Sequence, residues 1–260
     1  MVNKYIPVGI TSLSIISVII LYLLAPLGEN FFVVGDSVVT LCSFFAFVAG
    51  IWAARAYGIR SAQGKALLLL SLGVFLWFMG ELTWSVYEVV LGAEKPVASI
   101  ADVFWLLGYA VFIVGFYYIL KVGGISSRRK SAFLTVIAII VATTLVYMSL
   151  PTLFDEGLSL EEKISTAGYI IGDMLLLVSL IVIIGYMWGS RFAKAWSIIL
   201  FAFLLSTIAD VYYTLFLATY ETGNIIDILW NVDYILLAYG FYFNRMTLKS
   251  ILDAGKKGPN

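Results

Sequence analysis

The 260-residue chain contains no histidine and a single cysteine, Cys42. Without histidine there is no imidazole base for a catalytic triad, no histidine ligand for haem and no phospho-accepting histidine. A single cysteine rules out a disulfide within the chain and, because histidine is also missing, a Cys/His zinc site. The composition therefore indicates no cofactor, and it argues against an enzyme.

Charged residues are also scarce, at 12% of the chain, and Lys+Arg and Asp+Glu number 16 each. The lack of a basic excess argues against a nucleic-acid partner. Hydrophobic residues make up 62% of the chain, compared with ~45–50% in a soluble domain. The core of one water-soluble domain of this size is too small to bury so much apolar surface. We therefore expect the protein's main partner to be the lipid bilayer.

Long hydrophobic stretches account for this composition. A helix needs ~20 mostly apolar residues to cross the hydrocarbon core of a bilayer, and eight segments meet that requirement. They are residues 6–26, 33–56, 66–91, 99–120, 132–154, 164–188, 194–218 and 224–244. We therefore predict an all-α integral membrane protein with eight transmembrane helices, located in the cell membrane.

Basic residues gather on one side of the predicted membrane. They follow the second, fourth, sixth and eighth segments, as Arg128, Arg129 and Lys130 illustrate, and only Lys95 and Lys163 are left for the other side. The positive-inside rule places the side with more Lys and Arg in the cytoplasm. Both termini are therefore expected to be cytoplasmic.

The fourth and eighth segments resemble one another. The residues that recur at a constant offset include Asp102, Trp105 and Tyr109 in one segment and Asp227, Trp230 and Tyr234 in the other. We interpret this as a duplication of four helices, which makes two parallel repeats related by an axis along the membrane normal. The expected organisation is a first repeat at residues 1–122, a cytoplasmic linker at 123–131, a second repeat at 132–245 and a polar cytoplasmic tail at 246–260.

Carboxylates interrupt several of the hydrophobic segments. A charge at the bilayer centre costs ~2.5–3.5 kcal/mol, so these side chains should face protein or water rather than lipid. In both matching segments an acid, a tryptophan and a tyrosine are spaced i, i+3, i+7 and share one helix face. The direction of each segment places the acids in the outer leaflet or near the midplane. The candidate ligand-binding residues are Glu81, Trp84, Asp102, Trp105, Tyr109, Asp173, Asp210, Tyr213, Asp227, Trp230, Asp233 and Tyr234.

Carboxylates combined with aromatic rings suit a cation, because the carboxylates pair with its charge and the rings offer their negative faces. The same groups would suit protons or hard metal ions with oxygen ligands, so a metal is left open. Structural roles are the alternative. Trp and Tyr form belts at membrane interfaces, first-turn acids such as Asp102 and Asp227 cap helices, and deeper acids such as Asp173 bond to hydroxyl groups between helices.

Four short motifs occur in a familiar order. They are Ala101-Asp102-Val103-Phe104-Trp105-Leu106-Leu107-Gly108-Tyr109, Gly168-Tyr169-Ile170-Ile171-Gly172-Asp173-Met174-Leu175-Leu176, Ala209-Asp210-Val211-Tyr212-Tyr213, and Ile226-Asp227-Ile228-Leu229-Trp230 with Tyr234. Residues 70–245 resemble the multi-span N-terminal membrane sensory regions of bacterial diguanylate cyclases and membrane histidine kinases. In those families an attached cytoplasmic catalytic domain receives the signal, whereas this chain stops soon after its eighth segment. The resemblance implies a sensory module that signals to a separate cytoplasmic partner, or a sensor domain cut from a longer receptor.

These observations favour a membrane-embedded sensory or ligand-binding module. We expect an acidic, aromatic-lined cavity that opens to the extracellular side, receives a small ligand or cation and relays a signal to a cytoplasmic partner. A small cation- or proton-coupled transporter or channel is the alternative, since parallel repeats and midplane acids occur in carriers. An intramembrane hydrolase with a carboxylate-bound metal is a third hypothesis, which the absence of histidine disfavours.

Overall fold

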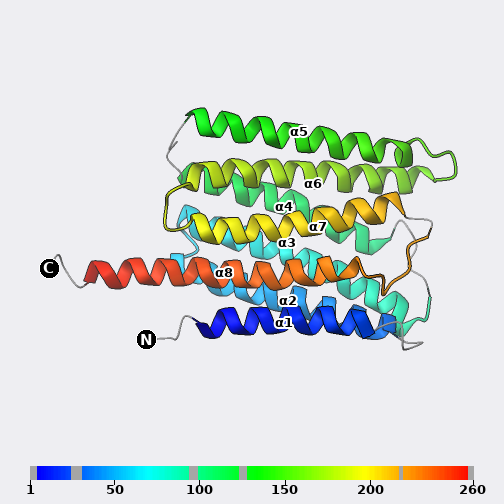
Figure 1. Cartoon of the computed structure of the whole chain (residues 1–260), viewed down its shortest axis with the longest axis horizontal. Coiled ribbons are helices and arrows are strands. Elements are labelled where there is room, and N and C mark those ends of the chain that lie inside the picture. Colours follow the sequence, from blue (N-terminus) through cyan, green and yellow to red (C-terminus); the bar gives the residue numbers. More distant parts are fainter. Residues whose placement is uncertain (1–4, 25–30, 94–98, 123–127, 217–218, 257–260) are drawn as a thin grey trace.

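In a computed structural model the chain is a bundle of long helices (Figure 1). The structure describes residues 5–24, 31–93, 99–122, 128–216 and 219–256. These residues form eight α-helices and one short π-helix, and they contain no strand. The helices are α1 (Tyr5–Leu24), α2 (Phe31–Tyr57), α3 (Ala62–Ser85), η2 (Val86–Val90), α4 (Ile100–Val122), α5 (Arg128–Leu153), α6 (Leu160–Met187), α7 (Ala193–Leu215) and α8 (Asp227–Lys256).

Six candidate spans are long and apolar enough to cross a membrane. They are formed by α1, α2, α3 continued by η2, α4, α6 and α7. The prediction of an all-α chain with apolar helices of membrane-spanning length is confirmed for these six. In α5 the longest continuous apolar stretch of described side chains is Thr135–Thr144. In α8 buried polar residues such as Asn231 and Asn244 lower the hydropathy.

Two expected boundaries differ from the structure. Much of the linker expected at 123–131 lies outside the described residues, but its last part belongs to a helix, because α5 begins at Arg128. The polar tail expected from residue 246 is helical as far as Lys256, because α8 continues through it without a break. Figure 1 shows this last part of α8 projecting beyond the other helices.

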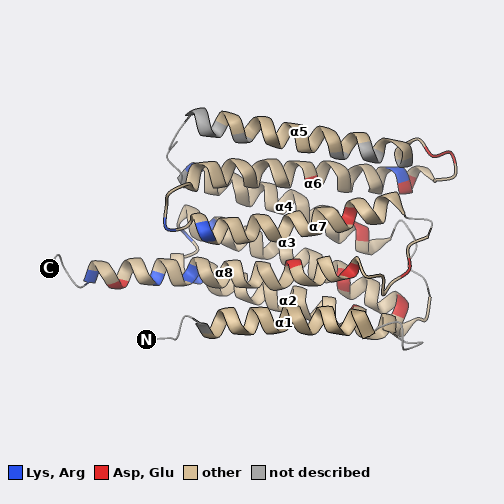
Figure 2. Ribbon diagram, viewed as in Figure 1, with Lys and Arg blue, Asp and Glu red and all other residues tan. Residues whose placement is uncertain are grey.

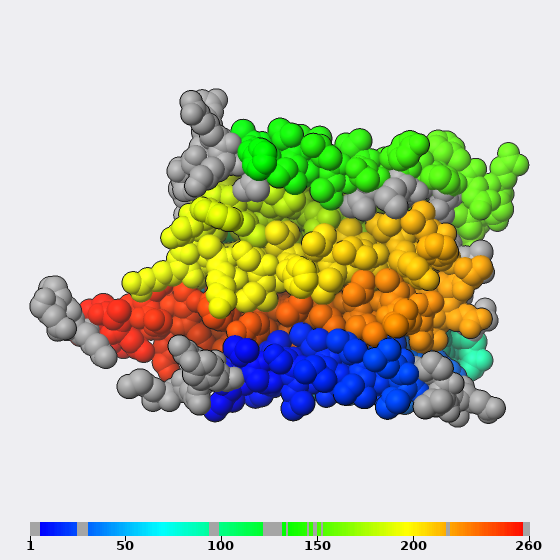
Figure 3. Space-filling view, in the orientation of Figure 1, coloured from blue at the N-terminus to red at the C-terminus, as the bar shows by residue number. Residues whose placement is uncertain are grey.

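Six of the helices form a closed ring. They pack in the order α2, α3, α4, α6, α7 and α8, and α8 returns to α2. Outside this ring, α1 packs on α8, and α5 packs on α6 and α7. Figure 3 shows α1 along the flank of α8. Among the α1 side chains that the structure describes, Val18 and Tyr22 are buried, while others such as Ile10 and Leu13 remain exposed. An apolar outer surface of this kind is suited to lipid.

Basic residues gather mainly at one end of the bundle, and acidic residues lie mainly towards the other (Figure 2). At one end, which we call the basic end, α1 begins and the projecting part of α8 lies. The turns α2–α3 and α6–α7 also lie there, with Arg60 and Arg191. At the opposite end, which we call the acidic end, the α5–α6 turn carries Asp155 and Glu156, close to Lys163 in α6. Lys95 lies outside the described residues.

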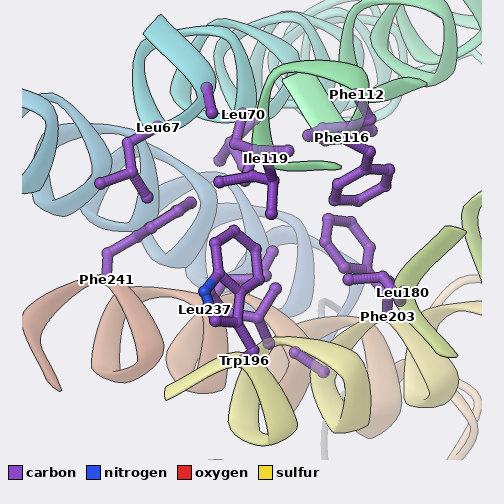
Figure 4. Packing of buried hydrophobic residues seen from close by; sticks show 14 of the residues in the cluster. Leu67, Leu70, Phe112, Phe116, Ile119, Leu180, Trp196, Phe203, Leu237 and Phe241 are labelled. Atoms are coloured by element: carbon purple, nitrogen blue, oxygen red, sulfur yellow. The ribbon is translucent and has the colours of Figure 1, made fainter. Parts of the chain in front are cut away.

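Large apolar side chains pack together inside the ring (Figure 4). Each of the labelled side chains is at most 1% exposed, and they come from five helices of the ring. They are Leu67, Leu70, Phe112, Phe116, Ile119, Leu180, Trp196, Phe203, Leu237 and Phe241. Their interdigitated packing closes the half of the ring towards the basic end.

Aromatic side chains pack where glycines let helices approach. A Cβ atom on Gly80 of α3 would lie 2.4 Å from Trp105 Nε1 in α4, so only a glycine leaves room for this indole. Likewise, a Cβ on Gly172 of α6 would lie 2.6 Å from the Tyr109 ring. The Gly168-x-x-x-Gly172 pattern therefore serves close packing of α6 on α4, as small-xxx-small patterns commonly do.

Replacing Gly80 with alanine should displace the Trp105 indole, because the new methyl group would overlap it. Overpacking of this kind costs about 1–3 kcal/mol. We therefore expect the Gly80→Ala variant to unfold at a lower temperature in detergent, measured by tryptophan fluorescence. The control is Gly9→Ala in α1, where no atom lies within 4 Å of the added Cβ. Equal stability of Gly80→Ala and the unchanged protein would contradict the close packing of α3 on α4.

Candidate ligand-binding site

The half of the ring towards the acidic end contains a cavity. The space inside it measures about 90 Å³, and side chains from seven helices and the α7–α8 loop line it. A single water needs ~10–15 Å³ of such space, so the cavity has room for several water-sized groups. Five carboxylates contribute to the wall, and none of the described lining residues is a lysine or an arginine. The carboxylates belong to Asp36, Glu81, Asp102, Asp210 and Asp227.

Aromatic rings form most of the remaining wall. The lining includes Tyr22, Trp77, Trp84, Trp105, Tyr109, Tyr169, Tyr213, Tyr220, Trp230 and Tyr234. Many of them meet edge to face, the preferred arrangement of aromatic pairs. The ring centroids of Trp84 and Tyr213 are 6.3 Å apart, and those of Tyr213 and Tyr220 are 4.9 Å apart. The rings therefore support one another as a continuous surface.

Trp77 separates the cavity from the apolar core. Its ring lines the cavity, and its centroid lies 4.9 Å from that of Phe112 and 5.7 Å from that of Phe203, both in the core. The indole N–H donates a hydrogen bond to the carbonyl oxygen of Trp105, at 3.1 Å. The cavity therefore has a floor made of packed aromatic side chains.

Glu81 is a half-buried acid that faces the cavity from α3. The hydroxyl of Tyr234 in α8 donates a hydrogen bond to Glu81 Oε1, at 2.8 Å. The Trp105 side chain of α4 also bonds to this carboxylate. Two donors from two different helices thus hold one carboxyl group in the wall.

Asp210 occupies the corresponding place on α7 and is also half-buried. Trp230 Nε1 in α8 donates to Asp210 Oδ1, at 2.9 Å. The Tyr109 hydroxyl in α4 lies 3.0 Å from Asp210 Oδ2. Like Glu81, this acid has one tryptophan and one tyrosine partner, each supplied by a neighbouring helix.

Asp102 and Asp227 stand where α4 and α8 begin. Asp102 Oδ2 accepts from the backbone N–H of Ser99, at 2.7 Å, and Oδ1 accepts from the Tyr169 hydroxyl, also at 2.7 Å. Asp227 Oδ2 accepts from the backbone N–H of Gly223, at 2.8 Å. Gly223 has a φ of 97°, a left-handed conformation that favours glycine. These two acids therefore satisfy backbone donors at helix starts in addition to lining the cavity.

Tyr220 reaches the cavity from the α7–α8 loop. Its hydroxyl donates to Asp227 Oδ1, at 2.8 Å, and its ring centroid lies 6.1 Å from that of Trp230. Burial and the neighbouring Asp227 carboxyl group raise the pKa of Tyr220 well above its usual value. The hydroxyl therefore keeps its proton and remains a hydrogen-bond donor.

Two of the predicted residues lie behind the wall rather than in it. Asp173 is 3% exposed and accepts hydrogen bonds from Tyr109 at 2.7 Å and Thr207 at 3.2 Å. Asp233 is fully buried, and among the described residues neither of its carboxyl oxygens has a partner at hydrogen-bonding geometry. Its polar neighbours include Ser206 and Glu81.

The other predicted residues all line this one cavity: Glu81, Trp84, Asp102, Trp105, Tyr109, Asp210, Tyr213, Asp227, Trp230 and Tyr234. Their role as ligand contacts stays a prediction. The predicted set lacked Tyr22, Asp36, Trp77, Tyr169, Tyr220 and Asn231. The sequence contained an indication for two of these residues, because Asp36 interrupts a hydrophobic segment and Tyr169 belongs to one of the four motifs. Tyr220 lies outside every helix, so no helical spacing could point to it.

The carboxylates are spread around the wall rather than gathered at one point. Within the part of the chain that the structure describes, no three Asp, Glu or Cys side chains converge closely enough to hold a metal ion. The arrangement is better suited to a larger cation, whose charge meets a carboxylate and whose apolar groups contact ring faces.

Comparison of the chain with protein families, curated proteins and solved structures finds no match. The similarity to bacterial membrane sensory regions therefore rests on the four motifs alone.

Removing the Tyr234 hydroxyl should destabilise the protein, because Glu81 would lose a donor. A lost hydrogen bond to a charged group costs about 1.5–3 kcal/mol, so we expect a lower unfolding temperature for Tyr234→Phe in detergent. The control is Tyr147→Phe in α5, since Tyr147 is 74% exposed. If both variants unfold at the same temperature, the Tyr234–Glu81 bond contributes nothing to stability.

Proposed function

We propose that the protein is a membrane-embedded receptor module that binds a small organic cation in this cavity and relays binding to a cytoplasmic partner. The observation that supports it best is a wall of five carboxylates and many aromatic rings without a described lysine or arginine. A cationic headgroup would lie near Glu81 and Asp210, the two half-buried acids, and its apolar groups would contact the rings. Limited access of water strengthens the attraction between such charges.

In this proposal the chain crosses the membrane eight times, with both termini in the cytoplasm. The start of α1 and the end of α8 lie at the same end of the bundle, which requires an even number of crossings. The basic end carries Arg60 and Arg191, as expected of a cytoplasmic face. The cavity, at the acidic end, then opens to the extracellular side.

The chain consists of two four-helix repeats, α1–α4 and α5–α8. The ring supports this assignment, because α2, α3 and α4 occupy places equivalent to those of α6, α7 and α8. The hydrogen bonds support it too, since Tyr109 reaches Asp210 in the other repeat and Tyr234 reaches Glu81 in return. The outer helices depart from this symmetry, because α1 packs on α8, whereas α5 packs on its own neighbours α6 and α7. A ligand between Glu81 and Asp210 would contact both repeats. If it bound one arrangement of the two repeats more tightly than another, it would shift the protein towards that arrangement.

A small cation- or proton-coupled transporter is the second candidate. Asp173 and Asp233 favour it, because they extend the acids from the cavity towards the middle of the bundle. The packed core beyond Trp77 favours the receptor, since Phe112 and Phe203 would have to separate before an ion could pass.

Choline should raise the unfolding temperature of the purified protein, because a ligand that binds only the folded state stabilises it. Its uncharged carbon analogue, 3,3-dimethyl-1-butanol, has nearly the same shape and should have no such effect. We expect Glu81→Gln and Asp210→Asn each to weaken choline binding about tenfold, equivalent to ~1.4 kcal/mol. Thermal-shift assays followed by titration calorimetry would measure both effects.

The matched control for these variants is Glu161→Gln, which neutralises an exposed acid at the start of α6. It should bind choline as the unchanged protein does. Equal stabilisation by choline and its uncharged analogue would contradict a cation site. Uptake of choline into proteoliposomes would instead favour the transporter.

The orientation can be tested with single cysteines in a Cys42→Ser background. Glu156 lies in the α5–α6 turn at the acidic end, and Arg191 lies in the α6–α7 turn at the basic end. On intact cells a membrane-impermeant maleimide should label the Glu156→Cys variant and leave the Arg191→Cys variant unlabelled until the cells are opened. The reverse pattern would overturn the proposed orientation.

A further inference from the structure

The hydroxyl of Tyr109 lies between two carboxylates. Its oxygen is 2.7 Å from Asp173 Oδ1 and 3.0 Å from Asp210 Oδ2. The tyrosine belongs to α4, and the two acids belong to α6 and α7. Its ring packs directly on the backbone at Gly172, where a Cβ would lie 2.6 Å away. Packing therefore holds the hydroxyl at this junction.

One hydroxyl proton is not enough for both contacts. A tyrosine hydroxyl donates one proton and can accept another bond in return. When Tyr109 donates to one acid, the second contact needs a proton on the other carboxyl group. Without it, two anions would face the same oxygen in a low-dielectric interior, which is unfavourable. The three groups therefore hold one additional proton, with a single negative charge between the two acids.

The two acids differ in their access to the cavity. Asp210 is half-buried in the cavity wall, and its Oδ1 accepts from Trp230 at 2.9 Å. Asp173 is 3% exposed and accepts a second bond from Thr207 at 3.2 Å. Either acid has donors for a negative charge. A positive charge in the cavity would favour that charge on Asp210, the acid it can reach.

We propose that Tyr109 is a proton relay that lets the shared proton exchange between Asp210 and Asp173, and that a cation in the cavity shifts this exchange towards Asp173. This inference rests on the proposed function. The O–H bond at Asp210 Oδ2 breaks as the Tyr109 oxygen takes that proton. The original O–H bond of Tyr109 breaks at the same time, and its proton forms an O–H bond with Asp173 Oδ1. No proton leaves the protein. Both hydrogen bonds reverse direction, and the negative charge moves to the cavity.

The groups around the relay leave it free to respond to a ligand. No described residue that lines the cavity carries a positive charge, so no fixed cation among the described lining residues holds the proton on one acid. The groups that face Asp173 are Tyr109 of α4 and Thr207 and Asp210 of α7. The groups that face Asp210 include Tyr109, Trp230 and Asp233, with Glu81 of α3, Tyr169 of α6 and Tyr213 of α7.

Infrared difference spectroscopy of the full chain in lipid nanodiscs tests the shared proton, because the C=O stretch of a protonated carboxyl group reports its hydrogen bonding. In the ligand-free protein at neutral pH we expect one carboxylic-acid band from this pair. The same band should be lost in Asp173→Asn and in Asp210→Asn, since one remaining acid needs no shared proton. A band that persists in both variants would overturn the shared proton.

Choline tests the relay in the same measurement. We expect it to shift the band in the unchanged protein and to leave it unshifted in Tyr109→Phe. Tyr169→Phe is the matched control, because it removes a neighbouring hydroxyl that donates to Asp102, and it should retain the shift. If choline binds by calorimetry without moving the band, the relay is wrong while the proposed function stands. If choline does not bind at all, the proposed function fails and the relay fails with it.

Discussion

The structure depends on how this bundle accommodates five carboxylates in a cavity wall made mostly of aromatic side chains. A buried acid is stable when donors satisfy it, and here the donors are phenolic hydroxyls and indole N–H groups on neighbouring helices. Tyr234 and Trp105 bond to Glu81, Trp230 donates to Asp210, and the Tyr109 hydroxyl bridges Asp210 and Asp173. The aromatic residues therefore have two tasks, since their polar atoms hold the acids and their rings form the wall.

Glycines determine where these aromatic side chains lie. Trp105 fits against Gly80 and Tyr109 against Gly172, at distances that leave no room for a methyl group. The acids consequently receive their hydrogen bonds from side chains whose positions are set by helix packing. The contacts between helices therefore set the orientation of these side chains. Small changes in helix packing would alter their hydrogen bonds to the acids directly.

Much of this arrangement could be predicted from the sequence, for identifiable reasons. Segment length and apolar composition predict the helices, and the i, i+3, i+7 spacing correctly places Asp102, Trp105 and Tyr109 on one wall. Spacing within a helix does not reveal how helices are rotated against one another. For this reason Asp173 and Asp233 were expected in the cavity but lie behind its wall. Tyr220 was missed because loop residues follow no helical period, and the extension of α8 was missed because polar composition alone does not end a helix.

The length of α8 has a mechanical consequence. Trp230 and Tyr234 near its start line the cavity, and the same unbroken helix continues to Lys256 beyond the basic end. At 1.5 Å per residue the distance from Trp230 to that tip is roughly 39 Å, so a tilt of about 4° would displace the tip by roughly 3 Å. The helix thus links the cavity to the opposite face, so a small tilt at the cavity would become a larger displacement at that face.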